Sequence, residues 1–164
     1  MAQTFLEVAE SLYTVMPRAM SLDLLKDYGL EVSAEQARHI TKEVLSLSLY
    51  WVRGAIHAKL RMDDAERVLT EVERCIAAGW KDFDLDESEP AAVLQEGRST
   101  SACYDRIVQE GGSAIAVLGE SAAALEFSGT IEEGARQKLL ALFLDVVPVE
   151  TFGELMETVE LADS

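Results

Sequence analysis

One segment, residues 33–60, constrains the fold more than any other part of the sequence. It opens with Ser33 and Gln36 at the spacing of a capping box, in which two side chains satisfy each other's free backbone N–H groups. Residues 45–51 also alternate with a period of two, as a strand does, but no turn residue bounds them. The apolar residues keep a helical spacing across the whole segment: Ile40, Val44, Leu47, Trp51 and Ala55. We therefore predict a long central helix over residues 33–60.

The same periodicity, broken by turn residues, marks shorter helices on both sides of this segment. We expect Asp63 or Asp64 to cap the next helix, and Thr130 to open a second capping box with Glu133. The expected helical segments are residues 5–16, 21–28, 64–78, 91–97, 101–110, 113–127, 130–147 and 151–161. The sequence thus predicts an all-α fold, a single-domain bundle of about six to eight unequal helices around a long central helix.

Charge is distributed unevenly along the 164 residues. Residues 1–79 carry 12 acidic and 9 basic side chains, whereas residues 80–164 carry 18 and 5, so most of the net charge of -16 lies in the C-terminal half. Residues 80–90 alone resemble a linker and mark a sub-boundary within one domain spanning residues 1–164. A surface this acidic repels nucleic-acid phosphates, so we expect no direct nucleic-acid binding and a basic protein partner instead.

The first residues of the sequence, its short apolar runs and its cysteines predict a cytoplasmic protein. The first residues lack the basic start and the apolar stretch of a secretion signal. The longest fully apolar run, residues 139–144, is far shorter than the roughly 20 residues that cross a bilayer, so we expect no membrane contact. Cys75 and Cys103 have no neighbour at metal-ligand spacing and are predicted to be free thiols.

One string imitates a catalytic motif. Gly119 and Ser121 follow an apolar run, as in the nucleophile elbow of the α/β-hydrolases. That fold places its histidine after the serine, whereas His39 and His57 both precede Ser121. We therefore expect Ser121 to be a helix residue among alanines.

Residues 80–86 interleave apolar and acidic side chains. The aspartates at every second position resemble the start of a calcium loop, but the glycine and the closing glutamate of that loop are missing. Two interpretations remain, a docking segment for a basic partner and a surface loop whose apolar side chains tuck onto the bundle. The residues assigned to partner binding are this segment and the glutamates of the last helix: Trp80, Asp82, Phe83, Asp84, Leu85, Asp86, Glu154, Glu157 and Glu160.

The predicted central helix carries one stripe with a positive bias. Tyr50, Arg53, His57 and Arg61 recur at helical spacing on one face. Such a stripe can bind a small anion or an acidic segment. The alternative is a solvated helix edge whose arginines pair with nearby carboxylates.

Helix-borne carboxylates raise the question of a metal. Glu35, His39 and Glu43 lie four residues apart, but a single histidine makes a poor transition-metal site. Local acidic pairs provide weak candidates for a divalent cation: Glu7, Glu10, Asp63, Asp64 and Glu66.

The leading hypothesis is a non-catalytic, acidic interaction protein without a cofactor, such as an adaptor, a chaperone-like binder, an inhibitor or an immunity-type factor. One alternative is a divalent-metal-dependent helical enzyme resembling a nucleotide pyrophosphatase. Another is a bundle that binds an apolar ligand between Trp51, Phe127, Phe143 and Met156. We also expect homodimerisation through the terminal apolar stripes around Phe5 and Phe152.

Overall fold

The computed structural model describes residues 2–162, and all regular secondary structure in that range is helical. The elements are α1 (Phe5–Val15), α2 (Leu22–Asp27), α3 (Ala34–Lys59), α4 (Met62–Ala78), the 3-10 helix η1 (Trp80–Phe83), α5 (Pro90–Gln109), α6 (Ala114–Phe127), α7 (Arg136–Val146) and α8 (Val149–Glu157). The predicted all-α bundle is confirmed. Within residues 2–162, no helix combines the length and apolar character needed to cross a bilayer.

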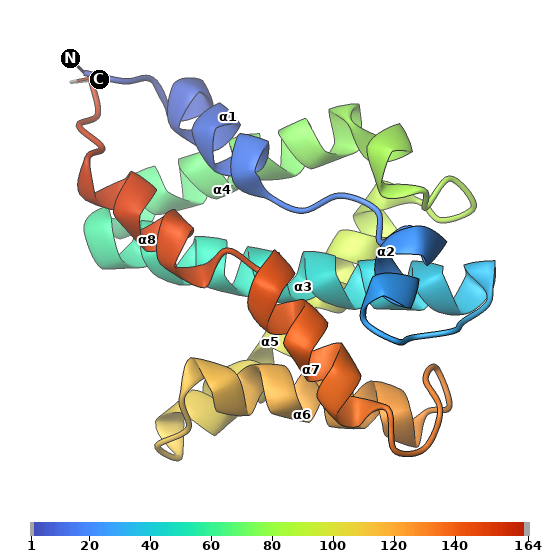
Figure 1. Cartoon of the computed structure of the whole chain (residues 1–164). Coiled ribbons are helices and arrows are strands. Elements are labelled where there is room, and N and C mark those ends of the chain that lie inside the picture. Colours follow the sequence, from blue (N-terminus) through green and yellow to red (C-terminus); the bar gives the residue numbers. More distant parts are fainter. Residues whose placement is uncertain (1, 163–164) are drawn as a thin grey trace.

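Helix α3 is the axis of the bundle. It runs through the middle of the molecule, with α1 and α4 on one side and α6 on the other, while α5 crosses behind it (Figure 1). The predicted capping box is present: the N–H of Ser33 donates to Gln36 Oε1 at 2.7 Å, and the N–H of Gln36 donates to Ser33 Oγ at 3.1 Å. The central-helix prediction is confirmed, and residues 45–51 are helical throughout.

Two apolar clusters flank α3. The first joins α1, α4 and α8 and includes Leu12, Val72 and Phe152. The second joins α2, α6 and α7 and includes Leu25, Leu118 and Phe143. The half-buried side chain of Trp51 packs against both clusters. Because each cluster draws on helices before and after residues 80–90, that segment divides two charge regions but not two cores.

Two predicted boundaries around α4 and α5 are wrong. Helix α4 is preceded by Arg61, and Asp63 and Asp64 lie in its first turn, where the helix dipole favours acids without a side-chain cap. The two predicted segments, residues 91–97 and 101–110, belong to one continuous helix, α5 (Pro90–Gln109), although it contains Gly97. This glycine is buried against α3, where an added Cβ would lie 3.2 Å from Ser46 Oγ. Gly97 therefore serves close helix packing and does not end a helix.

The predicted capping box at Thr130 is also wrong. Helix α7 starts only at Arg136. The turn before it is held from the preceding helix, because Glu126 Oε2 accepts the backbone N–H groups of Gly134 at 3.0 Å and Arg136 at 3.3 Å. The Glu126 carboxylate, near the end of α6, thus performs the role expected of Thr130.

The two chain ends pack on each other (Figure 1). The N–H of Gln3 donates to the carbonyl of Glu160 at 2.6 Å, and the N–H of Ala162 donates to the carbonyl of Gln3 at 2.9 Å. Phe152 is fully buried, and Phe5 packs against the same cluster. The terminal apolar stripes, from which we expected a dimer, thus face each other inside one chain.

Candidate functional site

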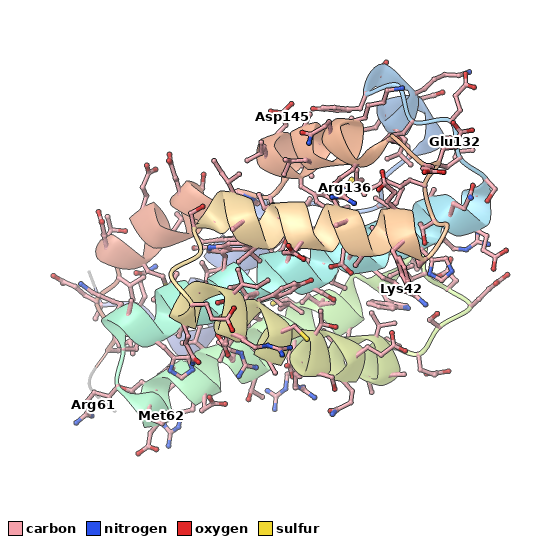
Figure 2. The ribbon with its side chains drawn as sticks, turned by 90° about the horizontal axis from the view of Figure 1, so that it is seen from below. Lys42, Arg61, Met62, Glu132, Arg136 and Asp145 are labelled. Carbon is pink, nitrogen blue, oxygen red and sulfur yellow. The ribbon has the colours of Figure 1, made fainter. Side chains whose placement is uncertain are left out.

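A hollow of about 720 Å³ opens between α3, α5 and α6. Figure 2 shows this side of the molecule, with α5 and α6 lying over α3, Lys42 towards one end of α3 and Arg61 just beyond the other. The charged side chains of the lining are Glu43 from α3, Arg106 and Glu110 from the α5 end, and Glu120 from α6. With three carboxylates and one guanidinium, the hollow favours a positively charged occupant.

One carboxylate oxygen joins three helices at the wall of this hollow. The hydroxyl groups of Tyr104, on α5, and Ser121, on α6, both donate to Oε1 of Glu43, on α3. Tyr104 and Ser121 are each only 3% exposed. Oε2 of Glu43 forms no hydrogen bond within residues 2–162, and it is not a buried atom. The donors therefore fix the carboxylate, and its second oxygen keeps its hydrogen-bonding capacity at the wall of the hollow.

The ionisation of Tyr104 supports this geometry. Burial raises the pKa of the Tyr104 hydroxyl far above its ordinary value, and the negative charge of Glu43 raises it further. Tyr104 is therefore a protonated donor at neutral pH. Hydrogen bonds to a charged acceptor are roughly twice as strong as neutral ones, so the pair of donors holds Glu43 firmly.

Ser121 occupies the helical position that the sequence predicts. It lies inside α6, where the surrounding backbone N–H groups are used by the helix, and its hydroxyl is directed to Glu43. An acyl-transfer nucleophile needs free N–H donors beside it to stabilise an oxyanion. The site is thus built for holding a carboxylate, and Ser121 is one of its supports.

Three of the four residues in the predicted positive stripe line a second hollow of about 480 Å³. Tyr50, Arg53 and His57 share it with Trp51, whose ring meets that of Tyr50 edge to face at 5.1 Å. Arg61 is not part of it, because α3 ends before that residue. Arg61 instead precedes α4, highly exposed, 3.9 Å from Asp64.

The residues assigned to partner binding do not form one surface. Trp80, Phe83 and Leu85 are buried in the first cluster, and the indole N–H of Trp80 donates to the carbonyl of Leu85 at 3.0 Å. These three side chains therefore belong to the core of the chain and present little surface to a partner. The carboxylates remain exposed, but Figure 1 shows their two groups at opposite ends of the molecule: Asp82, Asp84 and Asp86 after α4, and Glu154, Glu157 and Glu160 around the end of α8.

The weak metal candidates have other partners or stand apart. Glu7 Oε2 accepts the N–H of Thr4 at 2.7 Å in a capping box, and Glu66 Oε1 lies 3.4 Å from His57 Nε2. Glu10 and Asp63 are exposed on different helices. Within residues 2–162, no group of three or more histidine, cysteine, aspartate or glutamate side chains is arranged to hold a metal ion.

The apolar pocket expected between four large side chains is not formed. Phe143 and Met156 are buried in different clusters, and Phe127 is 96% exposed at the end of α6. Trp51 alone lines a hollow, the second one described above. The sequence shows that each of these side chains is apolar, but it does not show which helix each one packs against.

A comparison with protein-family models, curated proteins and solved structures finds no match for this chain. Its function is therefore inferred from the two hollows and from the charge around them. The sequence pattern relates Glu43 only to Glu35 and His39, because Tyr104 and Ser121 are distant from it in sequence. The one local signal is a serine inside an alanine-rich helix.

Proposed function

We propose that the protein is a non-catalytic binding protein that receives a cationic side chain of a basic protein partner in the hollow between α3, α5 and α6. The observation that carries this proposal is the Glu43 carboxylate, which lines the hollow and whose Oε1 is held by Tyr104 and Ser121 while Oε2 has no hydrogen bond within residues 2–162. A lysine ammonium or an arginine guanidinium matches a fixed carboxylate oxygen in charge and in hydrogen bonding.

The chemistry of Glu43 favours an organic cation over a metal ion. Magnesium and calcium require several oxygen ligands that converge on one point. At Glu43 the neighbouring hydroxyl groups direct their protons at the carboxylate, so they present donors to it. An ammonium group needs only acceptors spaced around it, which Glu110 and Glu120 in the same lining can add.

Preorganisation supports the same proposal. A free glutamate loses rotamer freedom when it binds a cation, and this loss reduces the affinity. Glu43 has already lost that freedom in the folded protein, because donors from two other helices fix it. The free energy of binding the partner is then not reduced by the cost of ordering this side chain.

The charge of the whole chain supports a basic partner in particular. The net charge is -16. Within residues 80–162 a single ion pair joins two residues of this half, Glu126 and Arg136, which lie 2.9 Å apart. The other carboxylates in that range are not neutralised in this way. The remaining negative field attracts a basic partner over a distance set by the salt concentration, and it speeds the encounter more than it strengthens the complex.

The proposal is tested with a fluorescent lysine–alanine peptide and its glutamate–alanine counterpart, with binding followed by fluorescence anisotropy at low and moderate salt. We expect the lysine peptide alone to bind, and its affinity to fall as salt rises. The double variant Glu110→Gln/Glu120→Gln should weaken binding about tenfold, since each change removes a charge from the lining.

The matched control is Glu132→Gln/Glu133→Gln, which removes the same charge from the exposed turn before α7, outside the hollow. This control should change the affinity by less than about twofold. Equal losses in the two double variants would show that the peptide responds to net charge alone. That result, or the absence of binding at low salt, would refute the hollow as the binding site.

A further inference from the structure

The second hollow has the composition of a small-molecule site. It lies between α3 and the turn that joins α5 to α6, and its walls are mainly apolar. Trp51 and Tyr50 contribute aromatic rings, while Val108 and Ala114 contribute aliphatic surface. Val108 is 46% exposed, so an apolar ligand seated here would cover surface that now faces water. Pockets of this size and character typically hold one small ligand with a few polar anchors.

We infer that this hollow binds a small aromatic carboxylate, with its ring against Trp51 and Val108 and its carboxylate at Arg53. This goes beyond the proposed function, because it concerns a different hollow and a ligand of opposite charge. Arg53 lies on the same face of α3 as Tyr50 and His57, and it forms no ion pair with any residue from 2 to 162. A planar guanidinium beside aromatic rings is well suited to a carboxylate, which it can bind with two parallel hydrogen bonds.

The other charges around the hollow determine the orientation of the ligand. Asp105 also lines it, on the side of Tyr50, and would repel a second carboxylate placed there. Burial raises the pKa of Tyr50, and Asp105 raises it further, so the Tyr50 hydroxyl stays protonated near the aspartate. His57 lies at the far end, 3.4 Å from Glu66. The carboxylate of the ligand therefore belongs at Arg53, with the ring between Trp51 and Val108.

A glycine, Gly54, lines the hollow. Gly54 lies inside α3, towards its C-terminal end, where glycine destabilises a helix by roughly 1 kcal/mol relative to alanine. A Cβ added there would meet no atom within 4 Å, so packing does not require the glycine. A larger side chain at this position would enter the space that the ligand needs, which provides a blocking variant.

The test uses 3-phenylpropionate, with its amide as the neutral analogue and 3-phenylpropylamine as the cationic one. The chain contains two tryptophans, so the two indole N–H signals in a ¹H–¹⁵N spectrum serve as reporter and internal reference. We expect the carboxylate to shift the signal of Trp51 and to leave that of the buried Trp80 unchanged. The amide should bind at least about tenfold more weakly, because it lacks the charge that Arg53 recognises.

Two variants locate the site. Arg53→Gln should reduce the affinity for the carboxylate about tenfold and leave the affinity for the amide unchanged. Gly54→Leu should abolish the shift of Trp51, whereas Gly119→Leu should not, since Gly119 also stands in open space inside a helix but lies outside this hollow. If the carboxylate leaves Trp51 unshifted, if all three analogues bind alike, or if Gly54→Leu still binds, the inference is overturned. None of these outcomes affects the lysine-peptide test, which concerns the hollow at Glu43.

Discussion

The hydroxyl group of Tyr13 occupies the space beside Gly79 in which a Cβ would otherwise stand. This hydroxyl is buried and has no hydrogen-bond partner within residues 2–162, while the guanidinium of Arg18 lies over the ring, 3.8 Å from its centre. Gly79 ends α4, as the sequence predicts, but its φ of -97° is not left-handed. Glycine is therefore needed here for the space it leaves to Tyr13 and not for its backbone conformation.

Two substitutions at this contact should compensate each other. Gly79→Ala should lower the free energy of unfolding by about 1–3 kcal/mol, because the new methyl group overlaps the hydroxyl of Tyr13. Tyr13→Phe should raise it by up to about 1 kcal/mol, since it removes a buried hydroxyl without a partner. Urea denaturation of the double variant should recover most of the loss caused by Gly79→Ala. Strictly additive effects would show that the two groups do not compete for space.

The hydrogen bonds to Glu43 should be coupled. Tyr104→Phe and Ser121→Ala should each lower the free energy of unfolding by about 1–3 kcal/mol, because each removes a charge-assisted hydrogen bond in a largely buried setting. Both donors share one oxygen, so the double variant should deviate from the sum of the single ones by at least about 0.5 kcal/mol. A double-mutant cycle measured by urea denaturation checks this. Additivity would mean that the two hydroxyl groups act independently.

Alkaline pH should expose the burial of Tyr104. Burial, followed by the charge of Glu43, raises its pKa in the folded protein, whereas an unfolded tyrosine ionises near pH 10. A raised pKa means that the folded state retains the proton longer. The stabilisation is therefore complete below about pH 10 and is lost progressively as the pH rises above it. The free energy of unfolding, measured by denaturation at a series of pH values across this range, should fall less steeply with pH for Tyr104→Phe than for the parent protein. Equal slopes would contradict the burial of this hydroxyl.

The sequence predicts the helices well because most of them are defined locally. The spacing of apolar residues and the pair Ser33 and Gln36 act over a few residues, and the structure reproduces both. Features decided by distant partners escape this reasoning. Gly97 resembles a helix end until Ser46 is placed against it, and the role of Glu43 depends on residues 104 and 121.

The acidic segment after α4 is a second case in which the outcome depends on residues distant in sequence. Alternating apolar and acidic residues suit a docking segment and a loop folded onto its own protein equally well. The difference lies in what covers Trp80 and Phe83, and that cover comes from the first apolar cluster, which includes residues from both chain ends. The acidic nature of the surface follows directly from the sequence, whereas its division into two separate groups requires the fold.

Two glycines inside helices should respond to substitution in opposite ways. Gly97→Leu should lower the free energy of unfolding by about 1–3 kcal/mol or more, because the side chain would enter the contact between α5 and α3 at Ser46. Gly119→Ala should raise it by about 0.5–1 kcal/mol, since the helix gains propensity and nothing lies within 4 Å. Gly119→Leu separates size from position, and thermal denaturation should show little change for it. A similar loss in both leucine variants would refute the close approach at Gly97.

The turn between α6 and α7 should weaken in acid through one carboxylate. Partial burial tends to raise the pKa of Glu126, but hydrogen bonds from the N–H of Gly134 and from Arg136 outweigh this effect and lower it. The folded state therefore releases the proton more readily than the unfolded state. The resulting stabilisation is present above the ordinary glutamate pKa of about 4.3 and is lost as the pH falls below it.

Glu126→Gln should accordingly reduce the melting temperature at neutral pH, and the difference from the parent protein should shrink as the pH approaches the acid range. Glu132→Gln is the matched control, because this exposed glutamate follows in the same turn and its carboxylate accepts no hydrogen bond from the turn's backbone within residues 2–162. Hydrogen exchange at the N–H groups of Gly134 and Arg136 should accelerate in Glu126→Gln and remain unchanged in the control. Equal exchange in both variants would show that the turn is held by its own residues, as the spacing from Thr130 to Glu133 first suggested, and not by the carboxylate from α6.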